Sequence, residues 1–201
     1  MGHGIEVAVE SLVGCRLFRR ALKERLVRKL QGKEGFTLIE LLIVVAIIGI
    51  IAAIAVPGLL RARMSGNETS AIGSLRAVSQ AEVSYSAACG QGAYAVLFAT
   101  LGVPAPGGTH SFLSPDLTGG GVTPFKSGFT YTLAAGAGAV AGAPDCNMTG
   151  TQTAFYTSAS PASYASTGNR SFATNQAGAI WQVNAAAAPT EPFGAPAMPI
   201  H

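Results

Sequence analysis

The 201-residue chain contains few charged side chains for its length. Charged residues make up 11% of the sequence and hydrophobic residues 49%. Intrinsically disordered chains are usually rich in charge and poor in apolar residues, so this class does not fit. The 25 glycines do not recur at every third position, which excludes a collagen triple helix. The length suits one domain with appendages rather than two full domains.

The few charges are unevenly distributed along the chain. Residues 1–35 contain eight Lys or Arg and four Glu, whereas residues 36–201 contain five Lys or Arg and six Asp or Glu. A nucleic-acid-binding protein normally carries a basic patch on its folded part, and the sequence demonstrates no such partner here. The basic residues instead precede a long apolar segment, which indicates a topology or targeting signal.

That apolar segment is LLIVVAIIGIIAAIAVPGLL, residues 41–60. At about 1.5 Å per residue, a helix of this length spans about 30 Å, the thickness of the hydrocarbon layer. We therefore predict a transmembrane helix over about 41–60, with the N-terminus held in the cytoplasm by the preceding cations. A cleaved secretory signal fits less well, because its apolar region has only about 7–15 residues and ends at a small-residue cleavage site.

Lys33-Glu34-Gly35-Phe36-Thr37-Leu38-Ile39-Glu40 precedes the apolar segment. Together the two resemble the processing site of type IV prepilins and of the related pseudopilins of type II secretion, over about residues 33–60. The resemblance implies that a membrane prepilin peptidase cuts after Gly35 and methylates Phe36. It also implies an assembly role for Glu40, a helix-kinking position at Pro57 and a small residue upstream of it, Gly49.

The same resemblance implies partners and a location. The partners are further copies of the same subunit in a homopolymer, the peptidase, an inner-membrane assembly platform and the membrane itself before assembly. The expected precursor is a single-pass protein of the bacterial inner membrane with a periplasmic head, which then enters an extracellular pilus or a periplasmic pseudopilus. A leader of 35 residues is long for this motif. Residues 15–31 read as a basic amphipathic helix on the cytoplasmic face of the membrane, and a start site assigned too far upstream is the other explanation.

An assembly role for Glu40 also has a physical basis. Cleavage before Phe36 would leave an α-amino cation four residues ahead of this carboxylate. The two groups are poorly placed to meet within one helix, but the carboxylate of one copy can meet the amine of a staggered neighbour. Pairing offsets most of the cost that each charge would carry alone in a low-dielectric bundle. The pair would therefore set the register between subunits.

The remaining sequence predicts an α+β fold in which a long N-terminal helix packs on a small antiparallel β-sheet head, a pilin-like arrangement. The helix is expected over 36–88, with a break at Ser65 and Gly66 as the alternative, and the head over 89–184. Residues 185–201 are rich in Ala and Pro and are expected to form a flexible tail. Strands are expected at 128–133, 153–157, 170–174 and 179–183, the last two as a hairpin.

Cysteine and histidine are scarce. Cys15 falls in the leader, so Cys89 and Cys146 form an even pair that predicts a disulfide bond in an oxidising periplasm, with two free thiols as the alternative. Two cysteines without neighbouring histidines do not make a metal site. His110 lies in a predicted loop, where nothing orients it as a catalytic base. We expect no catalytic residues, no metal, no cofactor and no enzymatic activity.

Three functional interpretations follow. The first is a type IV pilus subunit that is processed after Gly35 and polymerises through its N-terminal helix. The second is a pseudopilin of type II secretion, although Asp116 and Asp145 alone match the acidic calcium loops of major pseudopilins poorly. The third is a signal-anchored periplasmic binding domain. Cleavage after Gly35 separates the first two from the third, because a simple anchor keeps its leader.

Overall fold

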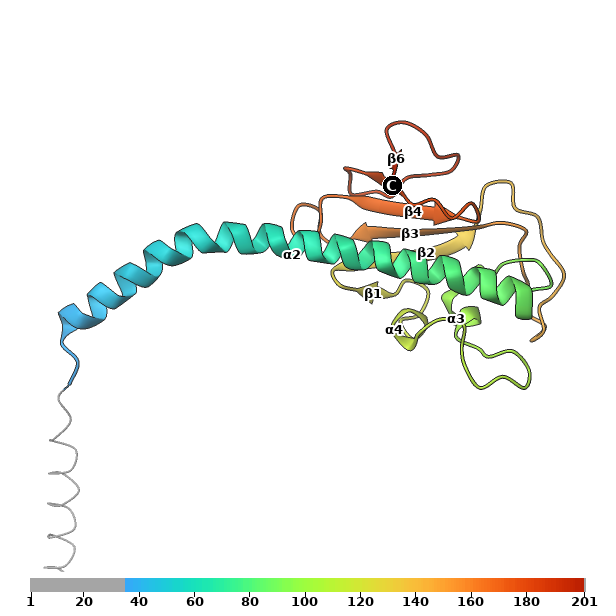
Figure 1. The fold of residues 1–201 in the computed structure, drawn as a ribbon, viewed down its shortest axis with the longest axis horizontal. Coiled ribbons are helices and arrows are strands. Elements are labelled where there is room, and N and C mark those ends of the chain that lie inside the picture. The colour runs from blue at the N-terminus through green and yellow to red at the C-terminus, as the bar shows by residue number, and fades with distance from the viewer. Residues whose placement is uncertain (1–34, 201) are drawn as a thin grey trace, which may run out of the picture. The chain divides into compact units, whose positions relative to one another are not determined.

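The computed structural model describes residues 35–200. Within this range the chain forms one long helix, two helices of four residues and a six-stranded antiparallel sheet (Figure 1). This arrangement confirms the predicted α+β, pilin-like fold class. The predicted leader, apart from Gly35, and the amphipathic segment 15–31 lie outside the described residues.

The chain divides into two compact units, and the boundary between them falls inside the long helix α2 (Leu38–Ala88), between Ile54 and Ala55. The first unit contains the start of α2, and the second contains the rest of α2 and the head. The helix is continuous at Ser65 and Gly66, so the alternative break does not occur there. Pro57 also lies inside the helix.

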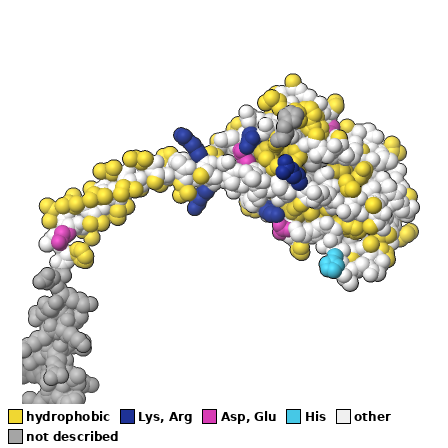
Figure 2. Space-filling view, viewed as in Figure 1, with side chains coloured by type: hydrophobic (Ala, Val, Ile, Leu, Met, Phe, Trp, Pro, Cys, Tyr) yellow, Lys and Arg dark blue, Asp and Glu magenta, His cyan; other side chains and the backbone are white. Residues whose placement is uncertain are grey.

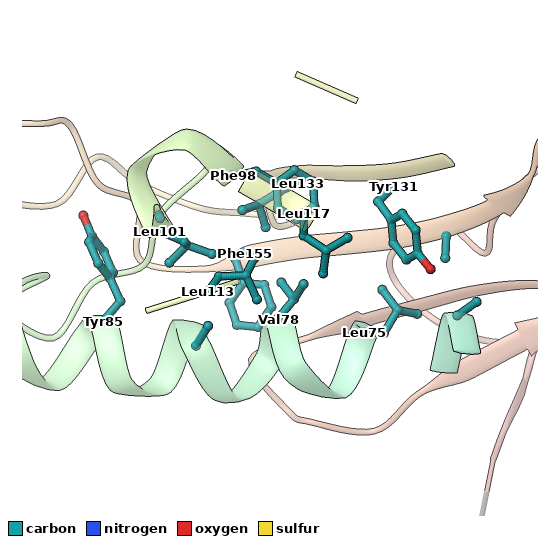
Figure 3. Close-up of a cluster of buried hydrophobic side chains, with 14 of the residues drawn as sticks. Leu75, Val78, Tyr85, Phe98, Leu101, Leu113, Leu117, Tyr131, Leu133 and Phe155 are labelled. Atoms are coloured by element: carbon teal, nitrogen blue, oxygen red, sulfur yellow. The ribbon is translucent and has the colours of Figure 1, made fainter. Parts of the chain in front are cut away.

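One face of α2 packs on the head. Ala71, Leu75, Val78 and Tyr85 follow one another at helical spacing, and all four are fully buried. Such spacing places them on one side of the helix. Figure 3 shows Leu75, Val78 and Tyr85 directed from α2 toward side chains of the head. The head contributes residues of two short helices and of the strands: Phe98 and Leu101 of α3 (Phe98–Leu101), Leu113, Leu117 of α4 (Pro115–Thr118), Tyr131, Leu133 and Phe155.

The six strands lie in the sheet in the same order as in the chain, each antiparallel to the next. The pair formed by the second and third strands is the longest, with Tyr131 opposite Ala159 in its register. Side chains alternate between the two faces of a strand, so Phe129, Tyr131 and Leu133 all point into the core shared with α2. The strands are β1 (Phe125–Lys126), β2 (Phe129–Ala135), β3 (Phe155–Pro161), β4 (Ser171–Asn175), β5 (Trp181–Val183) and β6 (Met198–Pro199).

The predicted strands are largely present. The β4–β5 hairpin forms as expected, and the N–H of Gly178 closes its turn on the Asn175 carbonyl at 2.9 Å. Strand β3 begins near the expected place but continues to Pro161. The sequence analysis missed β1 and β6, which have two residues each. A tight turn connects β1 to β2, and Ser127 and Gly128 in it have φ of 51° and 75°. Consecutive positive φ angles of this kind are typical of tight hairpin turns.

Residues 185–200 are the described part of the predicted flexible tail, and we call them the C-terminal segment; they contact the sheet at specific points. Tyr156 and Ser171 lie on the sheet face opposite the core, and their hydroxyls donate to carbonyls of Pro189 and Ala185, both at 2.6 Å. Phe193 stacks on Trp181 with ring centroids 5.4 Å apart. The segment returns to the sheet as β6. These hydrogen bonds and ring contacts fix the segment to the sheet, and its Ala- and Pro-rich composition does not indicate them.

Candidate functional site

The predicted processing site lies directly before α2. Gly35, Phe36 and Thr37 are not helical, and the Phe36 side chain is 87% exposed. A Cβ atom added at Gly35 would meet no atom within 4 Å. Packing within the described chain therefore does not require glycine at this position.

Thr37 and Glu40 form a reciprocal cap at the start of α2. The backbone N–H and the hydroxyl of Thr37 donate to Oε2 of Glu40 at 2.9 and 2.7 Å, and the Glu40 N–H donates to the Thr37 hydroxyl at 3.3 Å. This is the capping box, in which a Thr and a Glu three residues later satisfy each other's backbone donors. The Thr-x-x-Glu spacing of residues 37–40 is the sequence signal for this capping box, which was not among the predictions.

Within residues 35–200, no other part of the chain covers the apolar beginning of α2. Every residue from Leu38 to Leu60 is exposed except Ala52, which is partly exposed. The space-filling view shows hydrophobic side chains over the visible surface of this part of α2 (Figure 2). The helix is long and apolar enough to cross a membrane, and none of its most apolar window is buried. Gly49 has no neighbouring atom within 4 Å of an added Cβ.

Cys89 and Cys146 form the predicted disulfide bond, with Cα atoms 4.8 Å apart. Cys89 immediately follows the last residue of α2, and its carbonyl accepts the Cys146 N–H at 2.9 Å. The bond therefore ties the end of the helix to the loop between β2 and β3.

Asp145 holds the loop that carries Cys146. Its Oδ2 accepts the hydroxyl of Tyr85 on α2 at 2.7 Å, and its Oδ1 accepts the backbone N–H groups of Asn147 and Thr149 at 2.8 and 2.7 Å. Asp145 is 2% exposed. Burial and the contact with Asp145 raise the pKa of Tyr85, so the phenol stays a donor. A buried carboxylate with three donors is well satisfied.

A second carboxylate, Glu68, connects α2 to the opposite end of the sheet. Its Oε2 binds Nε and Nη2 of Arg170 at 2.8 and 2.7 Å, and its Oε1 accepts the backbone N–H of Asn169 at 2.8 Å. The Arg170 guanidinium also donates to Gln182 on β5 at 2.8 Å. Two N–H groups of one guanidinium converge on the same carboxylate oxygen, and such charge-assisted hydrogen bonds are stronger than neutral ones. The residues are more than 100 positions apart, and no local signal in the sequence indicates the pair.

Glu82 is the least satisfied polar side chain on the buried face of α2. Its Oε2 accepts the Ala95 N–H at 3.0 Å, but its Oε1 is buried without a partner within the described residues. Burial raises the pKa of Glu82 to about 8. The folded head therefore favours the protonated carboxyl, because a buried charge without a counter-ion is costly.

We expect the stability of the head to fall as the pH rises from about 4.5 to about 8 because of Glu82. The unfolded chain releases the Glu82 proton near pH 4.5 and the folded chain near pH 8. The contribution of protonated Glu82 to the free energy of unfolding is therefore fully present below about pH 4.5 and is lost as the pH rises toward about 8. Glu82→Gln should remove this component and stabilise the head by about 5 kcal/mol at pH 8.5 relative to its effect at pH 4, since each of the roughly 3.5 pKa units corresponds to about 1.4 kcal/mol. The single tryptophan, Trp181, reports unfolding by fluorescence. An equal difference between the two proteins at both pH values would contradict the prediction.

His110 contacts the Thr109 hydroxyl at 2.8 Å. Asp116, the other acidic residue considered in the sequence analysis, instead pairs with Lys126 at 2.5 Å. That pairing, with a hydrogen bond to Lys126 as the largest cause, lowers the pKa of Asp116. Among the described residues no group of three or more His, Cys, Asp or Glu is placed to hold a metal ion.

The described chain thus combines an exposed, membrane-length apolar helix with a disulfide-linked α+β head. Comparison with known proteins is consistent with this α+β, pilin-like arrangement. The model of the prokaryotic N-terminal methylation motif matches residues 30–56. Over 40 residues the chain is 58% identical to the type IV wide pilus major component PilA4 of Thermus thermophilus, and the match covers 20% of this chain and 30% of that protein.

A second relative is the type IV major pilin protein PilA of Myxococcus xanthus. It is 49% identical over 52 residues, which are 26% of this chain and 24% of that protein. Both matches span less than a third of the relative, and no solved structure matches the chain. The resemblance to type IV pilins predicted from residues 33–60 is confirmed for this N-terminal segment.

Proposed function

We propose that this protein is the precursor of a structural subunit of a type IV pilus and not an enzyme. The observation that carries the proposal is the apolar part of α2, which is exposed all round and begins with a motif shared with two type IV pilins. A helix of this kind is stable only when lipid or other helices cover it. Both relatives are named as pilus components, so the pseudopilin interpretation is not favoured.

The precursor is processed by a prepilin peptidase, which cuts after Gly35 and methylates Phe36. Two observations support this step. Phe36 is exposed ahead of the helix, and no contact within the described chain explains why residue 35 is a glycine. A requirement of the peptidase would explain it, because a protease cleft favours a residue that lets the backbone approach closely.

Before assembly the subunit lies in the inner membrane through residues 41–60, with the head in the periplasm. An inner-membrane assembly platform then moves it into a homopolymer outside the cell. In that polymer the apolar part of α2 exchanges lipid for neighbouring copies of itself. Gly49 permits close approach of a neighbouring helix, since it has no side chain and no neighbour in the single chain. Pro57 lacks a backbone N–H, which allows the helix to bend there.

We expect the mature protein to begin with an N-methylated Phe36, without residues 1–35. Intact-mass analysis of membrane and filament fractions measures this directly. Gly35→Ala should slow cleavage only partly, whereas Gly35→Leu should block it, because the larger side chain obstructs the approach of the peptidase. An unprocessed N-terminus in filament protein, or a cut at a small-x-small site after the apolar segment, would contradict the proposed function.

A further inference from the structure

Two large apolar side chains project from the β1 edge of the sheet. Val122, in the loop before β1, is 75% exposed, and Phe125, on β1 itself, is 64% exposed. We call this pair the β1 knob. Burying a side chain of this size is favourable by about 1.5–3 kcal/mol, so their exposure on a folded head marks an unsatisfied surface. The neighbouring Lys126 is already paired with Asp116 and therefore does not offer a free charge there.

The opposite edge of the same sheet contains a hollow. It has a volume of about 330 Å³ and lies between β5, β6 and the C-terminal segment. A second hollow of about 220 Å³ shares Val183, Ala185 and Pro196 with it. No charged side chain lines either one. We call the first the β6 hollow, and its lining residues are Gln182, Val183, Asn184, Ala185, Pro196 and Met198.

We propose that the β1 knob of one copy docks into the β6 hollow of the next copy. This proposal rests on the proposed function, since it describes how the heads of a pilus contact one another. The uncharged and mostly apolar lining matches the chemistry of Val122 and Phe125. The hollow is large enough for an aromatic side chain but not for a folded element. Because β1 and β6 have only two residues each, the contact depends on side chains and not on pairing of exposed backbone edges.

The positions of knob and hollow favour a second copy of the chain over another partner. They lie at opposite edges of one sheet (Figure 1), so each copy presents both halves of the contact. Such a contact is heterologous, and its repetition produces an open filament instead of a closed dimer. A two-fold dimer would need one surface that is complementary to itself. Neither edge of the sheet carries both the knob and the hollow.

Cross-linking in filaments tests the docking. In a Thr123→Cys/Asn184→Cys variant, each copy keeps Val122 and Phe125 and carries one exposed cysteine between them and one at the edge of the hollow. A short bis-maleimide should then produce a ladder of trimers and larger oligomers in sheared filaments. A self-complementary contact would produce dimers only, and that result would overturn the proposal. The matched control is Val140→Cys/Asn184→Cys, because Val140 is 65% exposed but belongs to the β2–β3 loop. It should give no ladder.

A second variant tests the docking without cysteines. Val122→Ser/Phe125→Ser should reduce the yield of sheared filaments by roughly tenfold or more, since about 1.4 kcal/mol per contact corresponds to a factor of ten. Val140→Ser should leave the yield unchanged. The wild type and both variants should have the same midpoint of thermal unfolding, measured by Trp181 fluorescence, because the substituted side chains are exposed. Normal filaments from the Val122/Phe125 variant would overturn the docking and leave the proposed function intact. Failure of the wild-type chain to enter filaments in a piliated host would overturn the proposed function and the docking together.

Discussion

Glu40→Leu is expected to give stable, processed and membrane-inserted protein with few or no sheared filaments. In the proposed polymer, the Glu40 carboxylate meets the methylated amine of Phe36 in a neighbouring copy. Removing the carboxylate leaves that amine buried and unpaired, which costs about 3–5 kcal/mol per subunit. The penalty recurs at every contact along the filament. As a lone acid at the membrane edge, by contrast, Glu40 could be replaced without loss of filaments, and insertion would even improve.

The capping box adds a competing explanation that the variants can separate. Glu40 accepts two hydrogen bonds from Thr37, so Glu40→Leu removes a cap as well as a charge. Loss of a cap costs about 1 kcal/mol, several times less than an unpaired buried amine. Thr37→Val removes the hydroxyl and keeps the carboxylate, whereas Glu40→Gln keeps an acceptor for Thr37 and removes the charge. If the charge is decisive, Thr37→Val should form filaments and Glu40→Gln should not.

Glu40→Asp keeps the charge but shortens its reach, so an intermediate filament yield is expected. The measurement is the ratio of sheared filament protein to total processed protein, with processing checked by intact mass. The Cys89–Cys146 bond in each variant confirms that the head is folded and exported. Normal filament yield from Glu40→Leu, with Phe36 fully processed, would show that this carboxylate does not set the register between subunits.

The features that the sequence predicted are those that depend on local pattern. Residues 41–60 are apolar without interruption, so their length alone indicates a membrane-sized helix. The alternation in 128–133 and the turn before Ala179 predict strands because the period of a strand is two residues. The Cys89–Cys146 pair was predictable because Cys15 falls in the leader, which leaves two cysteines for the exported part. Each of these inferences needed only the pattern of neighbouring residues or the number of cysteines outside the leader.

The missed features are contacts between residues far apart in the chain. Glu68 meets Arg170 across 102 positions, and Tyr85 meets Asp145 across 60. Glu82 lies within the buried face of α2 and accepts the Ala95 N–H, which is 13 positions away. The anchors of the C-terminal segment are single residues in an Ala- and Pro-rich background, so no local pattern indicates them. Glu191, for example, accepts the backbone N–H of Ala137 at 2.6 Å, and composition does not encode such a pairing.

Removal of the Cys89–Cys146 bond should produce the largest loss of stability in the head. The two cysteines are 57 positions apart, and closing a loop of that size stabilises a protein by about 4 kcal/mol in the chain-entropy view. For a domain of this size, that loss should lower the midpoint of thermal unfolding by roughly 10 °C. The Cys89→Ser/Cys146→Ser variant and the reduced wild-type protein should show the same shift in Trp181 fluorescence. Cys15→Ser is the matched control and should have no effect.

Part of the connection between α2 and the β2–β3 loop should survive without the disulfide. Tyr85 and Asp145 hold the same loop next to the end of the helix through a buried hydrogen bond of 2.7 Å. Tyr85→Phe leaves one Asp145 oxygen without its donor, which costs about 1–3 kcal/mol. Because the hydrogen bond and the disulfide restrain one loop, their combined loss should not equal the sum of the separate losses. In the cysteine-free background, Tyr85→Phe should therefore destabilise the head by a different amount than in the oxidised wild type. Strict additivity, measured by a double-mutant cycle on thermal unfolding, would show that the two restraints act independently.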